Sequence, residues 1–392
     1  MNGMAFAILW LARKSTKGTT MKAPNTSTNP SKVLTAACAA GLTVSLATPV
    51  ATAGETERMR VQAAVPSGSL SFEILEEFAD RVGSATNGRI DVEILSAGAI
   101  VSSDQILDAV DAGQVEAGFA WPQFWSGHHP ATALFSNTPV WPAEGLDQLT
   151  HFAWFYEGGG KELYSELMQE IIGKDIVSFP VTASGWQPLG WTNEEIETFD
   201  DFKSLRYRSP PGLIGEIFEE AGVSTVFLGP EELVPAAERG VVDMAGWINP
   251  VEDYAMGFHD VFDYYYLSSV HQFVDVGELV VNSAFYEGLS EADQSIIATT
   301  AQSVLMESYL RDIHRNSEML ETLQEQHGVT LKTTPADINT HLLEAAERVL
   351  AQRSDDDEFF ATIVDAQRDY ADTANTWWGE VLGIYGTLRN AE

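Results

Sequence analysis

Cysteine is nearly absent from this 392-residue sequence, which contains only Cys38. A single cysteine excludes an intramolecular disulfide and any cysteine-based metal cluster. Cys38 also lies within the first 53 residues, which we interpret below as an export signal. Cleavage after Ala53 would leave a mature chain without cysteine, whose stability does not depend on an oxidising compartment. The segment 35–38 leaves one alternative open, a lipoprotein-type processing site with a lipid anchor.

Basic residues are also scarce. The chain has 22 Lys and Arg against 57 Asp and Glu, a net charge of −35 at pH 7. A surface this acidic repels the phosphates of nucleic acids and of anionic lipids. The composition therefore argues against nucleic-acid binding. With 45% hydrophobic and 20% charged residues, it is typical of a globular chain, and the length allows two or three domains.

Long apolar runs are missing from most of the chain. After Gly54, none approaches the roughly 18 residues that a transmembrane helix needs. Before it, an acid-free apolar stretch, 33–53, follows Lys22 and Lys32 and ends in Ala-Thr-Ala. A basic start, an apolar stretch and an A-x-A ending are typical of a secretory signal peptide. We therefore expect residues 1–53 to direct export to the periplasm.

The start of this signal segment leaves two interpretations open. Met21 is the expected true start, because the signal is complete without the twenty residues that precede it. Those residues include an apolar piece, Met4–Ala12, which is too short to span a bilayer. An uncleaved membrane anchor is the alternative interpretation of this piece.

Catalytic motifs are lacking as well. The chain has neither the G-x-G-x-x-G of dinucleotide sites nor the G-x-S-x-G of α/β-hydrolases. The glycine run 158–161 fails the Walker pattern, because Phe155 and Glu162 occupy its two ends. His128 and His129 are adjacent, which is the wrong spacing for two metal ligands on one helix face. We therefore predict that the protein is not an enzyme, with a secreted hydrolase as a remaining alternative.

What the mature chain does contain is alternating strand and helix patterns. Three strand patterns and two helix patterns alternate within 58–121 and predict a parallel sheet with right-handed crossovers. A second α/β block follows at 181–270. From Ser290 onward the pattern is helical, beginning with an unusually long helix at 291–326. A signal segment, two α/β blocks and a helical tail suggest a periplasmic solute-binding protein.

Several segments resemble the substrate-binding subunits of TRAP transporters, the DctP superfamily. These segments are 104–118 (DQILDAVDAGQVEAG), 202–222 (FKSLRYRSPPGLIGEIFEEAG), 240–247 (GVVDMAGW) and 289–294 (LSEADQ). The resemblance implies an α/β fold of two lobes with hinge strands and a long helical C-terminal tail. We expect lobe I at 54–180 plus 271–289, lobe II at 181–270, and the tail at 290–392.

Within the superfamily, the chain is most similar to the branch that binds 2-oxo monocarboxylates and lactate. Gln187 stands four residues before Trp191, and Arg208 follows at the distance expected for the branch. The segments 247–250 (WINP) and 264–266 (YYY) match its Trp-x-x-Pro and Tyr-rich segments. The resemblance implies capture of a small carboxylate, such as pyruvate or lactate, and its delivery to TRAP membrane permease subunits. A periplasmic sensory protein is the alternative.

Six residues are the candidate substrate-binding side chains. They are Arg208, Gln187, Trp247, Gln272, Phe124 and Trp125. A guanidinium at Arg208 could hold a carboxylate through two parallel hydrogen bonds. The side-chain amide of Gln187 can bind a cation through its oxygen or donate a hydrogen bond to a ligand oxygen through its NH₂ group. Trp247 would form an apolar wall. Phe124 and Trp125 follow a predicted strand, and ligands of α/β sheets bind beyond the carboxyl ends of strands.

The sequence departs from the branch at two positions that usually carry acids, where it has Gly246 and Gln272. In the branch, the first acid binds a cation that is shared with the ligand carboxylate. Hard cations prefer several oxygens, carboxylates above all. The loss of both acids weakens the case for a bound metal, yet Gln187, the Trp247 carbonyl and Gln272 could still supply neutral oxygens for Na⁺ or Ca²⁺. Without a metal, Arg208 alone must neutralise the ligand. His271 and Asp275 are nearby candidates for contacts with other groups of the ligand.

The helical tail leaves the oligomeric state open. Members of this branch form dimers by exchanging a C-terminal helix. The apolar residues that could form such a face are Phe359, Phe360, Ile363, Val364, Trp377, Trp378, Val381 and Leu382. A homodimer through this helix and packing of the tail onto its own lobes are equal alternatives.

Overall fold

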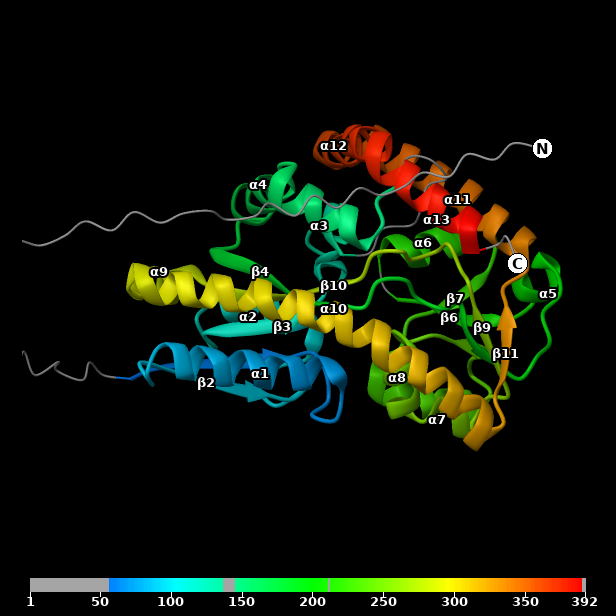
Figure 1. The fold of residues 1–392 in the computed structure, drawn as a ribbon, viewed down its shortest axis with the longest axis horizontal. Helices are drawn as coiled ribbons and strands as arrows, with labels where there is room; N and C mark the ends of the chain where they lie inside the picture. The colour runs from blue at the N-terminus through cyan, green and yellow to red at the C-terminus, as the bar shows by residue number, and fades with distance from the viewer. Residues whose placement is uncertain (1–55, 137–144, 211, 390–392) are drawn as a thin grey trace, which may run out of the picture. The chain divides into compact units, whose positions relative to one another are not determined.

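The computed structural model describes residues 56–136, 145–210 and 212–389 (Figure 1). The predicted signal segment, its start at Met21 and the lone Cys38 lie outside these ranges. None of the helices in the described ranges is long and apolar enough to cross a membrane.

The first sheet has five strands in the order β2-β1-β3-β10-β4. The strands are β1 (Glu57–Ala63), β2 (Ile90–Leu95), β3 (Ala117–Ala120), β4 (Ile176–Ala183) and β10 (Val276–Asn282). β1 runs parallel to β2 and β3, which confirms the predicted parallel sheet, while β10 lies antiparallel between β3 and β4. The crossover helices are α1 (Leu70–Ala85), capped by the Ser69 side chain, and α2 (Ile106–Asp111).

The second sheet has six strands in the order β11-β9-β5-β8-β6-β7. These are β5 (Gly190–Thr192), β6 (Arg206–Arg208), β7 (Ser224–Val226), β8 (Met244–Ala245), β9 (Tyr264–Leu267) and β11 (Thr330–Thr333). Its helices include α5 (Phe199–Lys203), α6 (Leu213–Glu220), α7 (Pro230–Glu238) and α8 (Pro250–Met256). The chain passes between the two sheets three times, from β4 to β5, from β9 back to β10, and from β10 to β11. The lobe boundaries given above stay a prediction.

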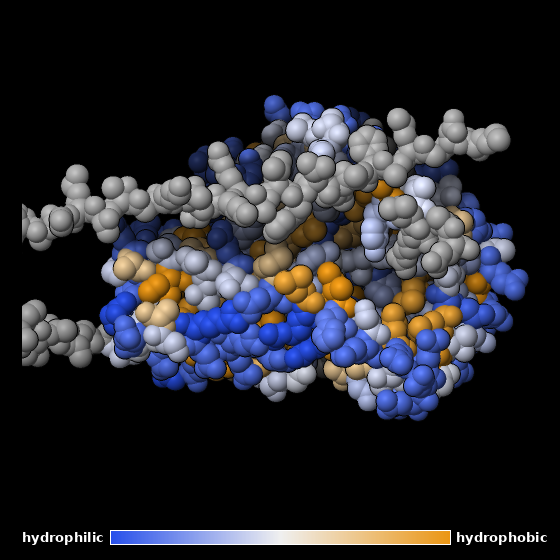
Figure 2. All heavy atoms as spheres, viewed as in Figure 1, coloured by the Kyte–Doolittle hydropathy of each residue, from blue (hydrophilic) through white to orange (hydrophobic). Residues whose placement is uncertain are grey.

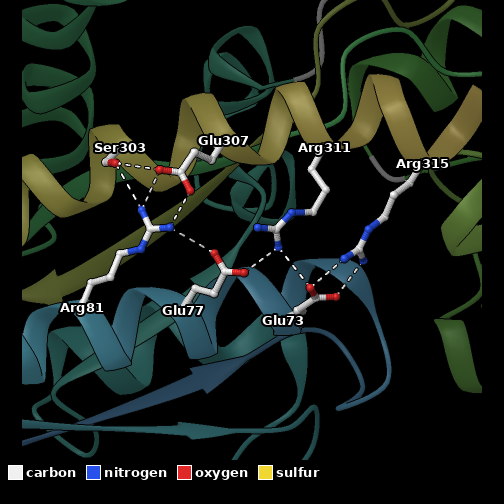
Figure 3. A network of polar contacts seen from close by, with 7 residues as sticks. All are labelled: Glu73, Glu77, Arg81, Ser303, Glu307, Arg311 and Arg315. Atoms are coloured by element: carbon white, nitrogen blue, oxygen red, sulfur yellow. Dashed lines mark hydrogen bonds and ion pairs between the residues drawn. The ribbon is translucent and has the colours of Figure 1, made fainter.

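One long helix contacts both halves of the structure. α10 (Glu291–His327) begins at Ser290, whose side chain accepts a hydrogen bond from the Asp293 N–H, and ends at Gly328 in the left-handed conformation. It packs on α1 and β4, and its last turns join the core of the second sheet through Leu323. Figure 3 shows acidic and basic side chains of α1 and α10 in one polar network, from Arg81 to Arg315.

The remaining tail helices also pack on this chain. α11 (Ala336–Asp356) lies on α6, and α12 (Glu358–Ala374) lies against α3 (Gln148–Glu157) and α4 (Gly160–Glu166). Of the face proposed for a dimer, Phe359, Phe360, Ile363 and Val364 belong to this intramolecular packing. The last helix, α13 (Glu380–Arg389), differs because its apolar side chains stay exposed.

Exposed apolar side chains also follow the solvent side of α10. Met306, Leu310 and Ile313 recur at helical spacing and are all exposed. Figure 2 shows hydrophobic residues over the middle of α10, among largely hydrophilic surroundings. Together with α13, this stripe is apolar surface that the described part of the chain leaves open to solvent.

Candidate functional site

A small cavity lies where the strand ends of the two sheets face each other. Its walls are Trp121, Gln123, Phe124, Gln187, Arg208, Pro210, Trp247, Ile248, Gln272 and Asp275. These residues follow β3, β4, β6 and β8 or precede β10, which runs antiparallel to β3. They therefore gather at the carboxyl ends of the parallel strands, where α/β sheets place ligands. The cavity has a volume of about 20 Å³, which is room for little more than a water molecule.

A larger hollow of about 870 Å³ lies on the surface between α6 and α11. Its charged side chains already pair with one another, as Arg348 does with Glu220 and Arg353 with Glu216. Such exposed pairs are typical of a solvated surface. We therefore assign the candidate site to the smaller cavity, where buried polar groups converge between apolar walls.

Arg208 is the basic residue of this cavity. Its Nε and Nη2 donate to the Leu228 carbonyl oxygen at 3.3 and 3.1 Å, and its Nη1 donates to the Gly246 carbonyl oxygen at 3.0 Å. A guanidinium has five N–H groups. The hydrogen bonds within the described chain therefore leave one N–H on each terminal nitrogen. Burial lowers the pKa of Arg208 to about 10, so its charge persists at neutral pH.

Aromatic rings surround this guanidinium from both halves of the structure. The Arg208 guanidinium lies 5.1 Å from the centre of the Trp247 ring, a cation–π contact that fixes its position. Trp121, which follows β3, meets Trp247 edge-on at 6.4 Å and Phe124 at 5.8 Å between ring centres. The apolar walls exclude water, which strengthens any ion pair formed inside.

Two amides complete the set that the sequence predicted. Gln187 lies between β4 and β5 and Gln272 between β9 and β10, and the main-chain N–H of Gln187 donates to the main-chain carbonyl oxygen of Gln272 at 3.0 Å. Both side chains line the cavity and are buried. The structure thus brings five predicted residues together (Arg208, Gln187, Trp247, Gln272 and Phe124). Their role in binding stays a prediction.

Trp125 is the predicted residue that does not line the cavity. Its side chain is fully buried in the core, and its Nε1 donates to Glu278 Oε1 at 2.7 Å. The 3₁₀ helix η2 (Pro122–Trp125) turns consecutive side chains in different directions, so Phe124 faces the cavity and Trp125 does not. The periodicity of the sequence could not predict Glu278 as the partner of Trp125, because Glu278 lies on β10, far away in sequence.

Of the two titratable residues predicted near the ligand, His271 and Asp275, only Asp275 lines the cavity. His271 is buried and bonds to Ser269 Oγ at 2.6 Å, and burial lowers its pKa to about 3, so it stays neutral. Asp275 does line the cavity, and burial raises its pKa to about 7. Gln187, Ser184 and Trp121 lower it in part, yet none of them makes a hydrogen bond of normal distance and angle to the carboxylate. Asp275 is therefore the acidic group of the site.

The donor set of the cavity suits a hard cation better than a transition metal. The described residues contain no cluster of three or more His, Cys, Asp or Glu side chains arranged for a metal ion. The cavity instead presents buried oxygens without a hydrogen-bond partner, on Gln123, Gln272 and Asp275. Amide and carboxylate oxygens are what Na⁺ and Ca²⁺ prefer. The residues present, including the predicted Gln272, therefore fit such a cation. Trp247, the other predicted ligand, lies in the same wall.

Comparison with known proteins is consistent with this geometry. The model of the DctP family, described as bacterial extracellular solute-binding protein, family 7, matches residues 61–356. The monocarboxylate 2-oxoacid-binding periplasmic protein of Nostoc sp. is 31% identical over 242 residues, which are 62% of this chain. The match spans 64% of that relative, less than two thirds of its length.

Two solved structures resemble the chain over most of its length. A TRAP periplasmic solute-binding protein from Pseudoalteromonas atlantica, with bound sodium and pyruvate, has a TM-score of 0.79 and 28% identity. One from Colwellia psychrerythraea, with bound calcium and pyruvate, has a TM-score of 0.78 and 26% identity. Each comparison covers 86% of this chain and 100% of the other. The predicted two-lobed fold and the family resemblance are confirmed.

Proposed function

Because the chain belongs to the DctP family of bacterial extracellular solute-binding proteins, we propose that it is the extracytoplasmic solute-binding subunit of a TRAP transporter. Its ligand in this proposal is a small 2-oxo monocarboxylate such as pyruvate, with lactate as a related candidate. Two similar structures hold pyruvate, and a relative is a 2-oxoacid-binding protein. The periplasm is the corresponding location, and the membrane permease subunits are the partners to which the ligand is delivered.

The observation that carries this proposal is the arrangement of Arg208. One N–H on each terminal nitrogen is left for a ligand, in a cavity with aromatic walls. A carboxylate can accept both in a two-pronged, charge-assisted pair. Trp121, Phe124 and Trp247 offer apolar walls against which the short carbon chain of such a ligand would pack. A Na⁺ or Ca²⁺ ion, when bound to oxygens of Gln272 and Asp275, would offset further negative charge.

Capture and release need no covalent chemistry in this proposal, and we expect no turnover of the ligand. Arg208 comes from the second sheet, while Asp275 and Phe124 come from segments next to the first. A ligand that bridges them favours the arrangement in which the two halves are close. Opening then exposes the Arg208 pair to water, which weakens it and allows release.

The test of this function is a ligand panel. Thermal unfolding of ligand-stripped protein would be followed with pyruvate, longer 2-oxo acids, lactate and C4-dicarboxylates. A ligand at 100 times its Kd adds about 2.7 kcal/mol of stability, which raises the Tm measurably. We expect the largest shift with short 2-oxo monocarboxylates. Equal or larger shifts with dicarboxylates, or no shift with any acid, would contradict the proposed substrate class.

Closure itself depends on a glycine at the meeting point of the two halves. Gly212 has φ +76°, and a Cβ added there would come within 2.5 Å of Ser126 Oγ, beyond the end of β3. We expect Gly212→Ala to hold the halves apart and to weaken ligand binding, since each 1.4 kcal/mol of cost to the closed state lowers apparent affinity about tenfold. Calorimetric titration with pyruvate would measure this change.

The matched control for this variant is Gly240→Ala. Gly240 also has a positive φ, +63°, but a Cβ there has no neighbour within 4 Å. Its replacement therefore carries backbone strain without the steric contact. Equal affinities of the two variants would show that the contact with Ser126 does not govern closure.

We also propose that the exposed apolar side chains of α13 and the turn before it form a homodimer contact. Trp377, Ile384 and Tyr385 are 74%, 61% and 66% exposed, which is unusual for large apolar residues. We expect Trp377→Asp combined with Tyr385→Asp to shift the protein from dimer to monomer in sedimentation velocity experiments. Ile171→Asp, at an exposed apolar position elsewhere, is the control. A monomeric wild-type protein at all concentrations would contradict this proposal.

A further inference from the structure

Three segments that carry the family resemblance meet at one buried carboxylate outside the cavity. Asp253 on α8 is 1% exposed, and its Oδ2 accepts hydrogen bonds from Trp191 Nε1 at 2.8 Å and from Tyr265 Oη at 2.9 Å. Its Oδ1 accepts one from the main-chain N–H of Ile248 at 3.0 Å. Trp191 is the tryptophan four residues after Gln187, Tyr265 belongs to the Tyr-rich segment, and Ile248 belongs to the Trp-x-x-Pro segment. The three segments thus converge on Asp253.

The two side chains that donate to Asp253 are held firmly by their own packing. Trp191 on β5 and Tyr265 on β9 are direct partners in the second sheet, and their rings stack with 4.0 Å between centres and 17° between planes. Both side chains are fully buried. In a close-packed interior neither ring can move without losing these contacts, so the carboxylate between them has one fixed position. Asp253 is therefore a rigid anchor for the group bonded to its other oxygen.

That other oxygen holds the segment 246–248, which forms one wall of the cavity. The Gly246 carbonyl oxygen accepts from Arg208 Nη1 at 3.0 Å, and the Trp247 ring lies 5.1 Å from the Arg208 guanidinium. Ile248 lines the cavity beside them. Because the segment lies between the end of β8 and the start of α8, the hydrogen bond from the Ile248 N–H to Asp253 fixes its path. Asp253 thus acts on the cavity wall from behind.

The charge of Asp253 strengthens this anchor. Burial raises the pKa of Asp253 to about 6, while its hydrogen bonds counteract that rise, so the carboxylate is mainly ionised at neutral pH. Hydrogen bonds to an ionised acceptor are about twice as strong as neutral ones. Asp253 also lies close to the cation of the site. Burial lowers the pKa of Arg208, and Tyr207 and Asp253 counteract that lowering in part.

We propose that Asp253 is a positioning residue that sets the chain-length selectivity of the cavity through Trp247. This inference rests on the proposed function, since it takes a small 2-oxo acid as the ligand. With the anchor intact, the Trp247 ring stays against the Arg208 guanidinium and forms a fixed apolar wall. A fixed wall distinguishes ligands that differ by one methylene about tenfold or more. Without the anchor the ring turns aside more readily, and the advantage of pyruvate over a longer acid decreases.

The experiment compares wild type with Asp253→Asn, which keeps the size of the side chain but turns one acceptor oxygen into an NH₂ donor. Calorimetry would give the Kd values of pyruvate and of 2-oxopentanoate, and wild type should bind pyruvate more tightly. In Asp253→Asn, the ratio of the two Kd values should change by about tenfold in favour of the longer acid. Tyr265→Phe keeps the carboxylate and removes one donor, so it should change the ratio in the same direction by about threefold. This second variant provides the test if Asp253→Asn does not fold.

The matched control is Glu278→Gln. Glu278 is also buried, and its carboxylate likewise accepts from a tryptophan indole, Trp125, and from a tyrosine hydroxyl, Tyr164. These three residues lie outside the cavity wall, so the variant should lower the Tm but keep the wild-type ratio of Kd values. An equal change of the ratio in Glu278→Gln and Asp253→Asn would overturn the inference. An unchanged ratio in both Asp253→Asn and Tyr265→Phe would do the same.

A double-mutant cycle tests whether Asp253 acts through Trp247. In the Trp247→Ala background, Asp253→Asn should change the ratio of Kd values by less than about twofold, because the wall that Asp253 positions is no longer there. A full tenfold change in that background would show that the effect does not pass through Trp247 and would overturn the inference.

A measurement without ligand separates this inference from the proposed function. In fluorine NMR of protein labelled with fluorotryptophan, the variant Trp247→Phe identifies the Trp247 signal. That signal should shift or broaden in Asp253→Asn but stay in place in Glu278→Gln. If wild type bound no 2-oxo acid, the proposed function would be contradicted, whereas an altered Trp247 signal would still support Asp253 as its anchor. An unchanged Trp247 signal in Asp253→Asn would overturn the inference whether or not a ligand binds.

Discussion

Replacement of Arg208 by alanine should weaken binding of a small 2-oxo acid by about 100-fold or more. Truncating one partner of a buried, hydrogen-bonded charge pair costs about 2–5 kcal/mol, because the remaining charge stays buried without a partner. In this cavity no other basic side chain lines the described wall, so nothing else can take over. Calorimetric titration of wild type and Arg208→Ala with pyruvate would measure the loss.

Arg206→Ala is the matched control for this prediction. Arg206 lies on the same short strand, but it is half-exposed and pairs with Asp243 outside the cavity. Its removal should leave pyruvate affinity nearly unchanged. Since Arg208 also binds the Leu228 and Gly246 carbonyls, Arg208→Lys tests whether charge without the planar fork is enough. Near-normal affinity of a folded Arg208→Ala protein would refute the assignment of the site.

The second large effect concerns stability against pH. Glu252 on α8 is buried, and its Oε1 accepts hydrogen bonds from Ser71 N–H and Oγ at the start of α1. Burial raises the pKa of Glu252 to about 7 from its ordinary 4.5, and Asp253 adds to this rise. The folded protein therefore holds this proton over a range where the unfolded chain has released it. Asp275 and Asp312 are close enough to be coupled to it electrostatically.

The sign of the effect follows from linkage. The contribution of Glu252 is fully present below pH 4.5 and is lost as the pH rises through about 7, since the folded state binds more protons in this window. A shift of this size corresponds to stability on the order of 3 kcal/mol. We expect Glu252→Gln, which resembles the protonated acid, to be more stable than wild type at pH 8.

Denaturant unfolding between pH 5 and pH 8 would test this prediction. The decrease in free energy of unfolding across that range should be smaller in Glu252→Gln than in wild type. Glu76→Gln, an exposed position on α1, should retain the wild-type decrease. If Glu252→Gln followed the wild-type curve, the buried acid would not be a source of the pH dependence.

The elements of this fold can be predicted because their signals are local. The long helix illustrates this. Its predicted range, 291–326, differs by one residue from the observed Glu291–His327, because Ser290 and Gly328 mark its ends within one turn of the chain. Arg208 was identified differently, from the distance after Gln187 that the family resemblance implies, and its guanidinium chemistry agreed with that position. Hydrophobic periodicity, caps and breakers lie within a few residues of the elements that they define.

The partners of polar groups could not be predicted, because they come from distant parts of the chain. Phe124 and Trp125 are neighbours in sequence, yet the antiparallel return of β10 brings Glu278 to the Trp125 indole and leaves Phe124 at the cavity. The same return places Asp275 in the wall of the cavity that Arg208 also lines. The sequence by itself determined the α/β elements and the acidic composition, and its resemblance to a family added the candidate arginine. Only the tertiary structure decided which buried side chains share the cavity, since that depends on how strands far apart in sequence are paired.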